Sequence, residues 1–487
     1  MFLEKIKNIL GLPYKDYILV KDLDKILMEE RIIDAIVAEG YTVIFYKDVE
    51  EFRYIFESQI KTKGLEKVLL ILNEDIYVAY DIIKWFSICN LNYGEIFSRL
   101  NRNILSQAKA LDLDLISIVY ENTYEDYSSE EMTHKFLNEI IYEDKHLMSY
   151  LSKLEEVLKK LMEKVNDYDK WFKIAYLNAR RNLIMGKLDL EKRELVDFSK
   201  DFQAYIFKDF GSLSGKSTYK GPILVSNVMD FLLRRKKKTA FIVLDGMSIS
   251  DWLVLERNLD YKAKTNFVFA MIPTVTSISR QSLLAGLLPQ ELEKPFSLAN
   301  EKKQYYSKVG EYLEESYINY YRGYDIEPSY KDFFITTVIN EIDDLVHRQM
   351  YGMEGHITDI ARMGQTGKLN KLIGKLLGYG FEVYIGSDHG NKESFGIGSP
   401  KGMGVEVETK SKKMMIIKDY VDIEELVEEY NLLEYPSYYL PKDYSYLLCG
   451  NNEALALEGT RIMSHGGISI EEVIVPFIKI EGEENNE

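Results

Sequence analysis

Short apolar runs alternate with amphipathic stretches in two parts of this chain of 487 residues, and this alternation limits the fold most strongly. In the first 125 residues the apolar runs are DYILV, YTVIFY, KVLLIL and LDLISIVY, and stretches such as DVEEFRYIFESQI lie between them. The alternation returns from about residue 220 to residue 483. Strands that alternate with helices form parallel sheets covered by helices. Both parts are therefore predicted to be α/β domains, with the four early runs as strands.

The chain between these two parts has a different pattern. From about residue 126 it is charged and leucine-rich, as in SYLSKLEEVLKKLMEKV, with leucines three or four residues apart. This spacing predicts amphipathic helices. The loop GSLSGKSTYKGP then predicts a boundary, because glycine and proline favour turns. We expect a small α/β domain at residues 1–125, a helical connector at residues 126–218 and a larger α/β domain at residues 219–487.

Charge and cysteine content limit the functions that such a chain can have. It has 61 basic and 78 acidic residues, and the resulting net charge of −17 opposes passive binding to DNA or anionic lipid. A polyanionic substrate would need local help, such as metal ions. Cys89 and Cys449 lie far apart, which argues against a disulfide framework and against a thiolate zinc site. No apolar stretch approaches the roughly 20 residues of a membrane span, and the first residues have no cleavable apolar core. We expect a cytoplasmic protein with no membrane partner.

Two stretches imitate sites for nucleotides or nucleic acids. GSLSGKST, residues 211–218, resembles a P-loop, but three residues separate its glycines where the motif has four. RRKKK, residues 234–238, could contact nucleic acid, yet five bases between a helix and a strand also fit a solvated helix end favoured by the helix dipole. We prefer the structural interpretation of both stretches.

Polar residues stand at the ends of two predicted elements in the C-terminal part. An apolar run over residues 240–244 places Asp245 at the carboxyl end of a strand, the edge where open parallel sheets bind ligands. In FVFAMIPTVTSISRQSLLAG, Thr274 or Thr276 begins a helix, beside free backbone N–H groups that can gather a phosphate. Such a threonine becomes a nucleophile only if its pKa is lowered, for example by a metal. Taken alone, Asp245 could end a turn and either threonine could be an N-cap.

Further ligand types occur in three later segments. Asp343 and His347 are four residues apart, so on a helix they can share a metal, although a surface ion pair is the alternative. Asp388 and His389 end the strand of FEVYIGSDHG, and His465 lies in a glycine-flanked turn before the last strand. Each could be structural by itself. Together with Asp245 they make three carboxylates and three imidazoles, a set that suits two divalent ions.

The order of these motifs resembles a known family. Strand-Asp-Gly, Pro-Thr-x-Thr-x-x-x-Arg, Asp-x-x-x-His on a helix, Ser-Asp-His-Gly and His-Gly-Gly before a Val-Pro strand are similar to the PglZ domain, a branch of the alkaline phosphatase superfamily found in BREX-type phage defence. The resemblance covers residues 239–480 and implies a doubly wound, mostly parallel α/β sheet with a two-metal centre. It implies one ion among Asp245, Thr276, Asp388 and His389, and another held by Asp343, His347 and His465. It also implies a catalytic group of Thr276 as nucleophile, Thr274 as the second choice, and Arg280.

The resemblance leads to an expected function. We expect a two-metal phosphoester hydrolase, with zinc as the first choice of metal and manganese or magnesium as alternatives. The first hypothesis is a phosphodiesterase or nuclease that acts on nucleotides, oligonucleotides or nucleic acid in anti-phage defence, with other defence proteins as partners. A phosphomonoesterase of the same superfamily and a non-catalytic scaffold subunit of a defence complex are the alternatives.

Overall fold

The computed structural model describes residues 2–163, 165, 167–190, 195–216, 221–398, 412–418 and 423–482. It divides into two compact units, Met1–Ser152 and Lys153–Glu487. The division into three parts at residues 125 and 218 stays a prediction. Its second boundary lies outside the described residues, as do the last two residues of GSLSGKST.

A four-stranded parallel sheet forms the centre of the first unit. Its strand order is β2-β3-β1-β4, and every neighbouring pair is parallel. Three of the four expected strands are confirmed as β1 to β3, and β3 is rich in branched aliphatic residues and buried at every position, as a central parallel strand requires. The strands are β1 (Tyr17–Asp22), β2 (Thr42–Phe45), β3 (Val68–Leu72) and β4 (Ser87–Leu91).

The expected strand in LDLISIVY is wrong. This run lies in helix α7 (Leu113–Asn122), which Asp112 caps by accepting a hydrogen bond from the backbone N–H of Leu115. Leu115, Ile116 and Val119 are buried, at the spacing of one helical face. A short apolar run without flanking turns fits either element, and the cap decides for the helix.

Helices surround the first sheet and continue through the middle of the chain. The predicted helical character of residues 126–215 is confirmed, and the described part of this stretch contains no strand. The remaining helices up to that point are α1 (Phe2–Leu10), α2 (Glu30–Ala38), α3 (Val49–Ile55), α4 (Tyr80–Ile83), α5 (Tyr93–Ile96), α6 (Arg102–Gln107), α8 (Glu130–Asn138), α9 (Asp144–Met162), α10 (Tyr168–Leu188) and α11 (Ser199–Asp209).

The second unit contains a six-stranded sheet of order β6-β16-β9-β5-β8-β7. The last four strands in this order are parallel to one another, while β16 runs antiparallel to both of its neighbours, so one strand of the six opposes the rest. The strands are β5 (Thr239–Leu244), β6 (Lys262–Phe269), β7 (Ile318–Arg322), β8 (Phe334–Ile339), β9 (Glu382–Gly386) and β16 (Ile474–Glu481).

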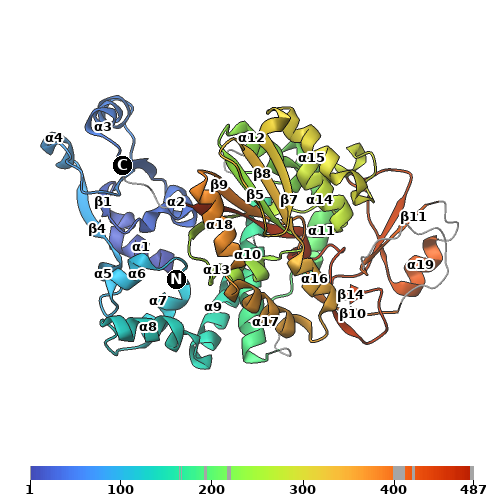
Figure 1. Cartoon of the computed structure of the whole chain (residues 1–487). Coiled ribbons are helices and arrows are strands. Elements are labelled where there is room, and N and C mark those ends of the chain that lie inside the picture. The colour runs from blue at the N-terminus through green and yellow to red at the C-terminus, as the bar shows by residue number, and fades with distance from the viewer. Residues whose placement is uncertain are drawn as a thin grey trace. The chain divides into compact units, whose positions relative to one another are not determined.

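Both faces of this sheet are covered, which confirms the doubly wound fold (Figure 1). Strand β5 shows why: Phe241 and Val243 belong to one buried cluster, whereas Ala240, Ile242 and Leu244 belong to another. Alternate residues of a strand point to opposite faces, so an apolar residue at every position requires helices on both sides. The first cluster includes residues of α10, α11, α12 (Val228–Arg234), α14 (Thr276–Ala285) and α15 (Glu301–Gly310), and the second includes residues of α13 (Ile249–Glu256), α16 (Glu341–Arg348), α17 (Gly352–Gln365) and α18 (Lys368–Gly378).

Two small three-stranded sheets complete the second unit, with orders β14-β10-β15 and β11-β13-β12. Their elements are β10 (Lys392–Gly396), β11 (Met414–Ile417), α19 (Ile423–Tyr430), β12 (Leu433–Glu434), β13 (Ser445–Leu448), β14 (Glu453–Ala454), β15 (Arg461–Ser464) and α20 (Ile470–Val473). The RRKKK stretch joins the end of α12 to β5 and is mostly exposed, as expected of a solvated helix end. Among the described helices, none combines the length and the apolar character that crossing a membrane requires.

Candidate metal centre

The predicted ligand residues meet at one edge of the six-stranded sheet. Strands β8, β5 and β9 are parallel neighbours, so their carboxyl ends open at the same edge. One carboxylate follows β5, an acid–imidazole pair follows β9, helix α16 begins directly after β8, and the turn after β15 adds an imidazole. The residues brought together in this way are Asp245, Asp343, His347, Asp388, His389 and His465.

Asp245, Asp388 and His389 form the first group of ligand atoms. The Nε2 atom of His389 lies 3.8 Å from Oδ1 of Asp245 and 3.8 Å from Oδ2 of Asp388. Both of these carboxylate oxygens are buried and accept no hydrogen bond from the described residues. The other oxygen of Asp388 accepts from the backbone N–H groups of Gly246 and His389, at 3.1 Å each. Since buried polar atoms are nearly always paired, the two free oxygens indicate a place for a cation.

Asp343, His347 and His465 form the second group. Oδ1 of Asp343 lies 3.4 Å from Nε2 of His347 and 3.4 Å from Nε2 of His465, and the two imidazole nitrogens are 3.3 Å apart. Ligands about 2.0–2.1 Å from a tetrahedral zinc ion lie about 3.3–3.4 Å from one another. The three atoms therefore have the spacing of one face of a zinc tetrahedron. His389 also has its ligand atom near Asp343 and His465, so it stands between the two groups.

Backbone carbonyls orient two of the imidazoles. Nδ1 of His389 lies 3.1 Å from the carbonyl of Gly390, and Nδ1 of His465 lies 3.0 Å from the carbonyl of Thr274. A carbonyl can only accept, so each Nδ1 carries the proton and each Nε2 offers a lone pair to the centre. Metal-binding histidines are commonly held in this way. The two rings are stacked, with centroids 4.3 Å apart.

The two candidate threonines have different surroundings. Thr276 is the first residue of α14, it is partly exposed, and its hydroxyl lies 3.0 Å from Nε2 of His389. Thr274 is fully buried: its hydroxyl donates to the carbonyl of Gly467 at 3.0 Å and accepts from the N–H of Gly466 at 2.9 Å. The hydroxyl of Thr276 thus faces the ligand atoms, whereas the hydroxyl of Thr274 holds the loop that carries the last histidine.

Arg280 lies behind the first group and is only 1% exposed. Its guanidinium donates to Asp245, and its Nε donates to Glu301 at 2.7 Å. Glu301 is 2% exposed and also accepts from Tyr320 at 2.5 Å and from Arg322 at 2.6 Å. Arg280 therefore holds one oxygen of Asp245, and the other oxygen faces the centre. Arg280 acts by positioning this carboxylate.

Burial changes the acidity of these groups. It raises the pKa of Asp245, with the charge of Asp388 adding to the effect, and it also raises the pKa of Asp388. Burial works in the same direction on Asp343, but the hydrogen bond with His347 and the neighbouring imidazoles bring its pKa well below the usual value. Burial lowers the pKa of His465 to about 4, so this imidazole is neutral at neutral pH. A neutral imidazole is the form that binds a metal.

The sequence gives little indication of several residues that support the metal centre. Ser279 donates to the carbonyl of Asp388 at 2.5 Å, and Asn391 donates to the carbonyl of Gly246 at 2.9 Å. Asn391 is held in turn by the buried carboxylate of Asp251, at 2.6 Å. For Asp251 the Ser-x-x-Asp spacing that begins at residue 248 predicts a capping box, which the structure contains. The others are isolated polar residues whose partners are distant in sequence.

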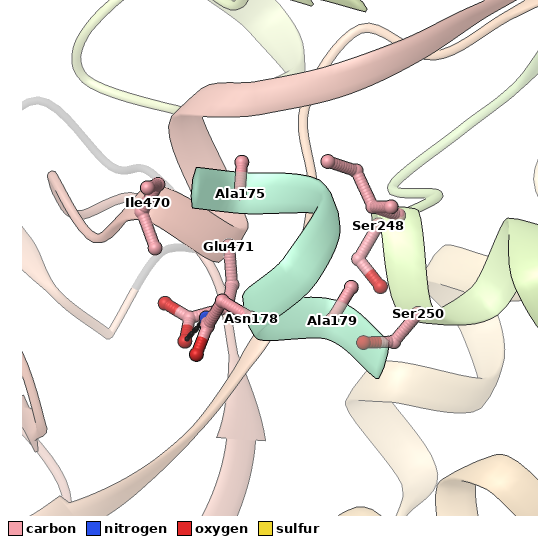
Figure 2. A pocket seen from close by; sticks show the side chains of 8 residues that line it. Ala175, Asn178, Ala179, Ser248, Ser250, Ile470 and Glu471 are labelled. Carbon is pink, nitrogen blue, oxygen red and sulfur yellow. Dashed lines mark hydrogen bonds between the residues drawn. The ribbon is translucent and has the colours of Figure 1, made fainter. Parts of the chain in front are cut away.

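The described part of the second unit contains a small cavity and an open cleft. A cavity of about 10 Å³ lies between α10, the start of α13 and α20, where Asn178 donates to Glu471 at 2.8 Å (Figure 2). It holds at most one water molecule. An open cleft of about 560 Å³ is lined by Arg280, on the metal-centre side of the sheet edge, and is large enough for part of a substrate.

Sequence comparison identifies the domain that carries this centre. Residues 223–304 and 330–480 match the family model described as the BREX system PglZ alkaline phosphatase-like domain. These residues include both ligand groups and Thr276. The chain contains a PglZ domain. The resemblance inferred from the order of the motifs is thereby confirmed, and the matched residues include five of the six strands of the large sheet, all except β7, and the edge where the ligands gather.

Comparison with solved structures gives distant matches to parts of this chain. Murine ectonucleotide pyrophosphatase/phosphodiesterase 5 is 14% identical, matches 50% of this chain and 88% of its own, and has a TM-score of 0.35. Phosphonoacetate hydrolase from Sinorhizobium meliloti 1021, solved with phosphonoformate, is 13% identical over 50% of this chain and 90% of its own, with a TM-score of 0.32. A search of curated protein sequences found no significant match.

Proposed function

We propose that this protein is a two-metal phosphoester hydrolase that cleaves phosphodiesters of nucleotides or oligonucleotides, with Thr276 as the nucleophile. The observation that carries the proposal is the pair of ligand groups beside the Thr276 hydroxyl. Asp245, Asp388 and His389 would hold one ion, and the 3.3–3.4 Å triangle of the second group would hold the other, with zinc as the best-fitting metal.

The position of Thr276 suits attack on phosphorus. Thr276 is the first residue of α14. The first backbone N–H groups of a helix have no helical partners, so they can bind an anion there. When bound, two divalent ions would neutralise the phosphoryl oxygens and lower the pKa of the threonine hydroxyl. The Thr276 oxygen would form a bond to phosphorus while the bond to the leaving alcohol breaks and that alcohol takes a proton. Water would then hydrolyse the phosphothreonine, which releases the phosphate product and restores the hydroxyl.

The proposal includes the cellular role and location of the protein. The family is described as a domain of BREX systems. This supports a role in anti-phage defence together with other defence proteins. Both cysteines are free thiols, and this supports a reducing compartment such as the cytoplasm.

The test is a substrate comparison with purified protein. The chain is treated with a chelator, reloaded with zinc, manganese or magnesium, and assayed on bis-p-nitrophenyl phosphate, p-nitrophenyl phosphate and short oligonucleotides. We expect the chelator to remove activity, a divalent metal to restore it, and the diesters to be cleaved faster than the monoester. A faster monoester reaction would make the protein a phosphomonoesterase. Failure on every substrate with every metal would reject hydrolysis and leave the scaffold alternative.

A further inference from the structure

The open cleft beside the metal centre is built from the ends of neighbouring strands. Arg322 ends β7, and Asn340 follows β8. The backbone N–H of Asp245 donates to the carbonyl of Ile339 at 3.0 Å, so Asn340 comes directly after the residue that pairs with this metal-ligand candidate. The residues that line the cleft are Arg280, Leu298, Arg322, Gly323, Val338 and Asn340.

The charges in this cleft favour an anion once a metal is bound. Arg322 has a side chain that is 46% exposed, and it donates to Glu301 at 2.6 Å and to Asn340 at 3.2 Å. Glu301 also pairs with Arg280, so two guanidinium groups share one buried carboxylate on this side. The second partner of Arg280 is Asp245, whose charge a bound metal would offset. With both carboxylates counted the wall is neutral, and it would become cationic once a metal offsets the charge of Asp245, in a chain whose net charge is −17.

The contacts of Arg322 also fix its orientation. Glu301 holds one edge of the guanidinium, while the exposed part of the side chain remains open to the cleft. A guanidinium that is already oriented loses little freedom when it binds a phosphate in its planar fork. Asn340 directly precedes α16 and does not cap it through its side chain. Its Oδ1 accepts from Arg322, and its amide N–H groups lie beside Arg322.

The strand order gives the approximate distance of Arg322 from the metal centre. Strand β8 lies between β5, which ends before Asp245, and β7, which ends at Arg322. Neighbouring strands are about 4.8 Å apart, so Arg322 belongs to a strand about 10 Å from that of Asp245. A group bound there is therefore separate from the phosphoryl group at Thr276, but within reach of the same small substrate.

We propose that Arg322 and Asn340 form a second anion subsite, which binds a phosphate of the substrate other than the phosphate under attack. The preferred substrates then carry at least two phosphates, as in an oligonucleotide with a neighbouring phosphate or in a nucleoside polyphosphate. This subsite rests on the proposed hydrolysis at Thr276 and names its substrate class.

The test compares substrates that differ by one phosphate. The dinucleotide TpT, with one phosphate, is compared with pTpT, with two, using the metal-loaded full chain. We expect wild type to have a kcat/KM at least tenfold higher for pTpT than for TpT. In Arg322→Gln this ratio falls by about tenfold or more, because a charge-assisted contact is lost.

Two further variants complete the experiment. Arg362→Gln removes an exposed arginine of α17 and serves as the matched control, with the wild-type ratio expected. Asn340→Asp places a carboxylate against Arg322 and is expected to lower the ratio as well, even if Arg322→Gln folds poorly. The subsite would be overturned if each of the two variants, Arg322→Gln and Asn340→Asp, lowered kcat/KM for TpT and for pTpT by the same factor. A wild-type ratio near one would also overturn it. Failure of wild type to cleave bis-p-nitrophenyl phosphate with any of the metals would instead overturn the proposed phosphodiester hydrolysis.

Discussion

At the scale of single residues, two threonines with one residue between them have separate tasks. Thr276 presents its hydroxyl to His389, while Thr274 uses both its hydroxyl and its carbonyl to hold the loop around His465. Both stand before the same predicted helix, so the sequence alone leaves them as alternatives. The difference depends on a contact between segments that are 191 residues apart.

Substitution separates these two tasks. Thr276→Ala is expected to lower the turnover of bis-p-nitrophenyl phosphate on the order of 1,000-fold while metal content and thermal stability stay at the wild-type level, because it removes the proposed nucleophile. Thr274→Val keeps the side-chain shape but leaves a buried N–H and a buried carbonyl unpaired, so we expect a loss of about 1–3 kcal/mol in the free energy of unfolding. Wild-type turnover in Thr276→Ala would assign the nucleophile elsewhere.

At the scale of elements, the turn between β15 and α20 depends on a fully buried ion pair. Nζ of Lys413 lies 2.8 Å from Oε2 of Glu472, and neither side chain is exposed. Glu472 also accepts hydrogen bonds from the backbone of Gly467 and from the hydroxyl of Ser469, at 2.9 and 2.6 Å. The pair thus fixes the backbone that follows His465.

Breaking this pair tests its structural importance. Lys413→Met leaves the carboxylate of Glu472 buried without its cation, and we expect a loss of about 3–5 kcal/mol in the free energy of unfolding. The double variant Lys413→Met/Glu472→Gln removes both charges and should recover part of this loss. Chemical denaturation measures all three proteins. A double variant less stable than the single one would show that the carboxylate has other essential partners.

The elements themselves were predictable to different degrees. Helix α16 follows from the spacing of Asp343 and His347, and β5 and β9 follow from apolar runs that end in acids. Helix α7 does not, since its short apolar run also fits a strand and Asp112 decides between them. Strand β4, with the sequence SICNL, is largely exposed and has no hydrophobic pattern to mark it.

At the scale of the whole molecule, a parallel sheet explains why a site made of distant segments was visible in the sequence. Residues that follow parallel strands gather at one edge, so strand ends with acids and imidazoles predict a common centre. The layer behind the centre was not predictable. Glu301 and Glu472 are acids in the first turns of helical segments, and only the packing of distant elements shows that they are buried and paired.

The overall charge leads to a prediction about salt. In a chain with a net charge of −17, the proposed metal centre and the proposed Arg322 subsite would together contact about two phosphates of an oligonucleotide. For single strands this predicts a slope of about −1 to −2 when log(1/KM) is plotted against log salt concentration. Steady-state cleavage of an oligonucleotide at several sodium chloride concentrations gives the slope. A slope of about −4 or steeper would reveal an extended basic surface.

The number of divalent ions bound per chain tests the two-metal centre most directly. After chelation, reloading with zinc and removal of free metal, elemental analysis should find two ions in wild type. Asp388→Asn and His347→Ala should each hold one, because each variant loses a ligand of a different group. No bound metal in the folded wild-type protein, or two ions in both variants, would contradict the two-metal centre at this sheet edge.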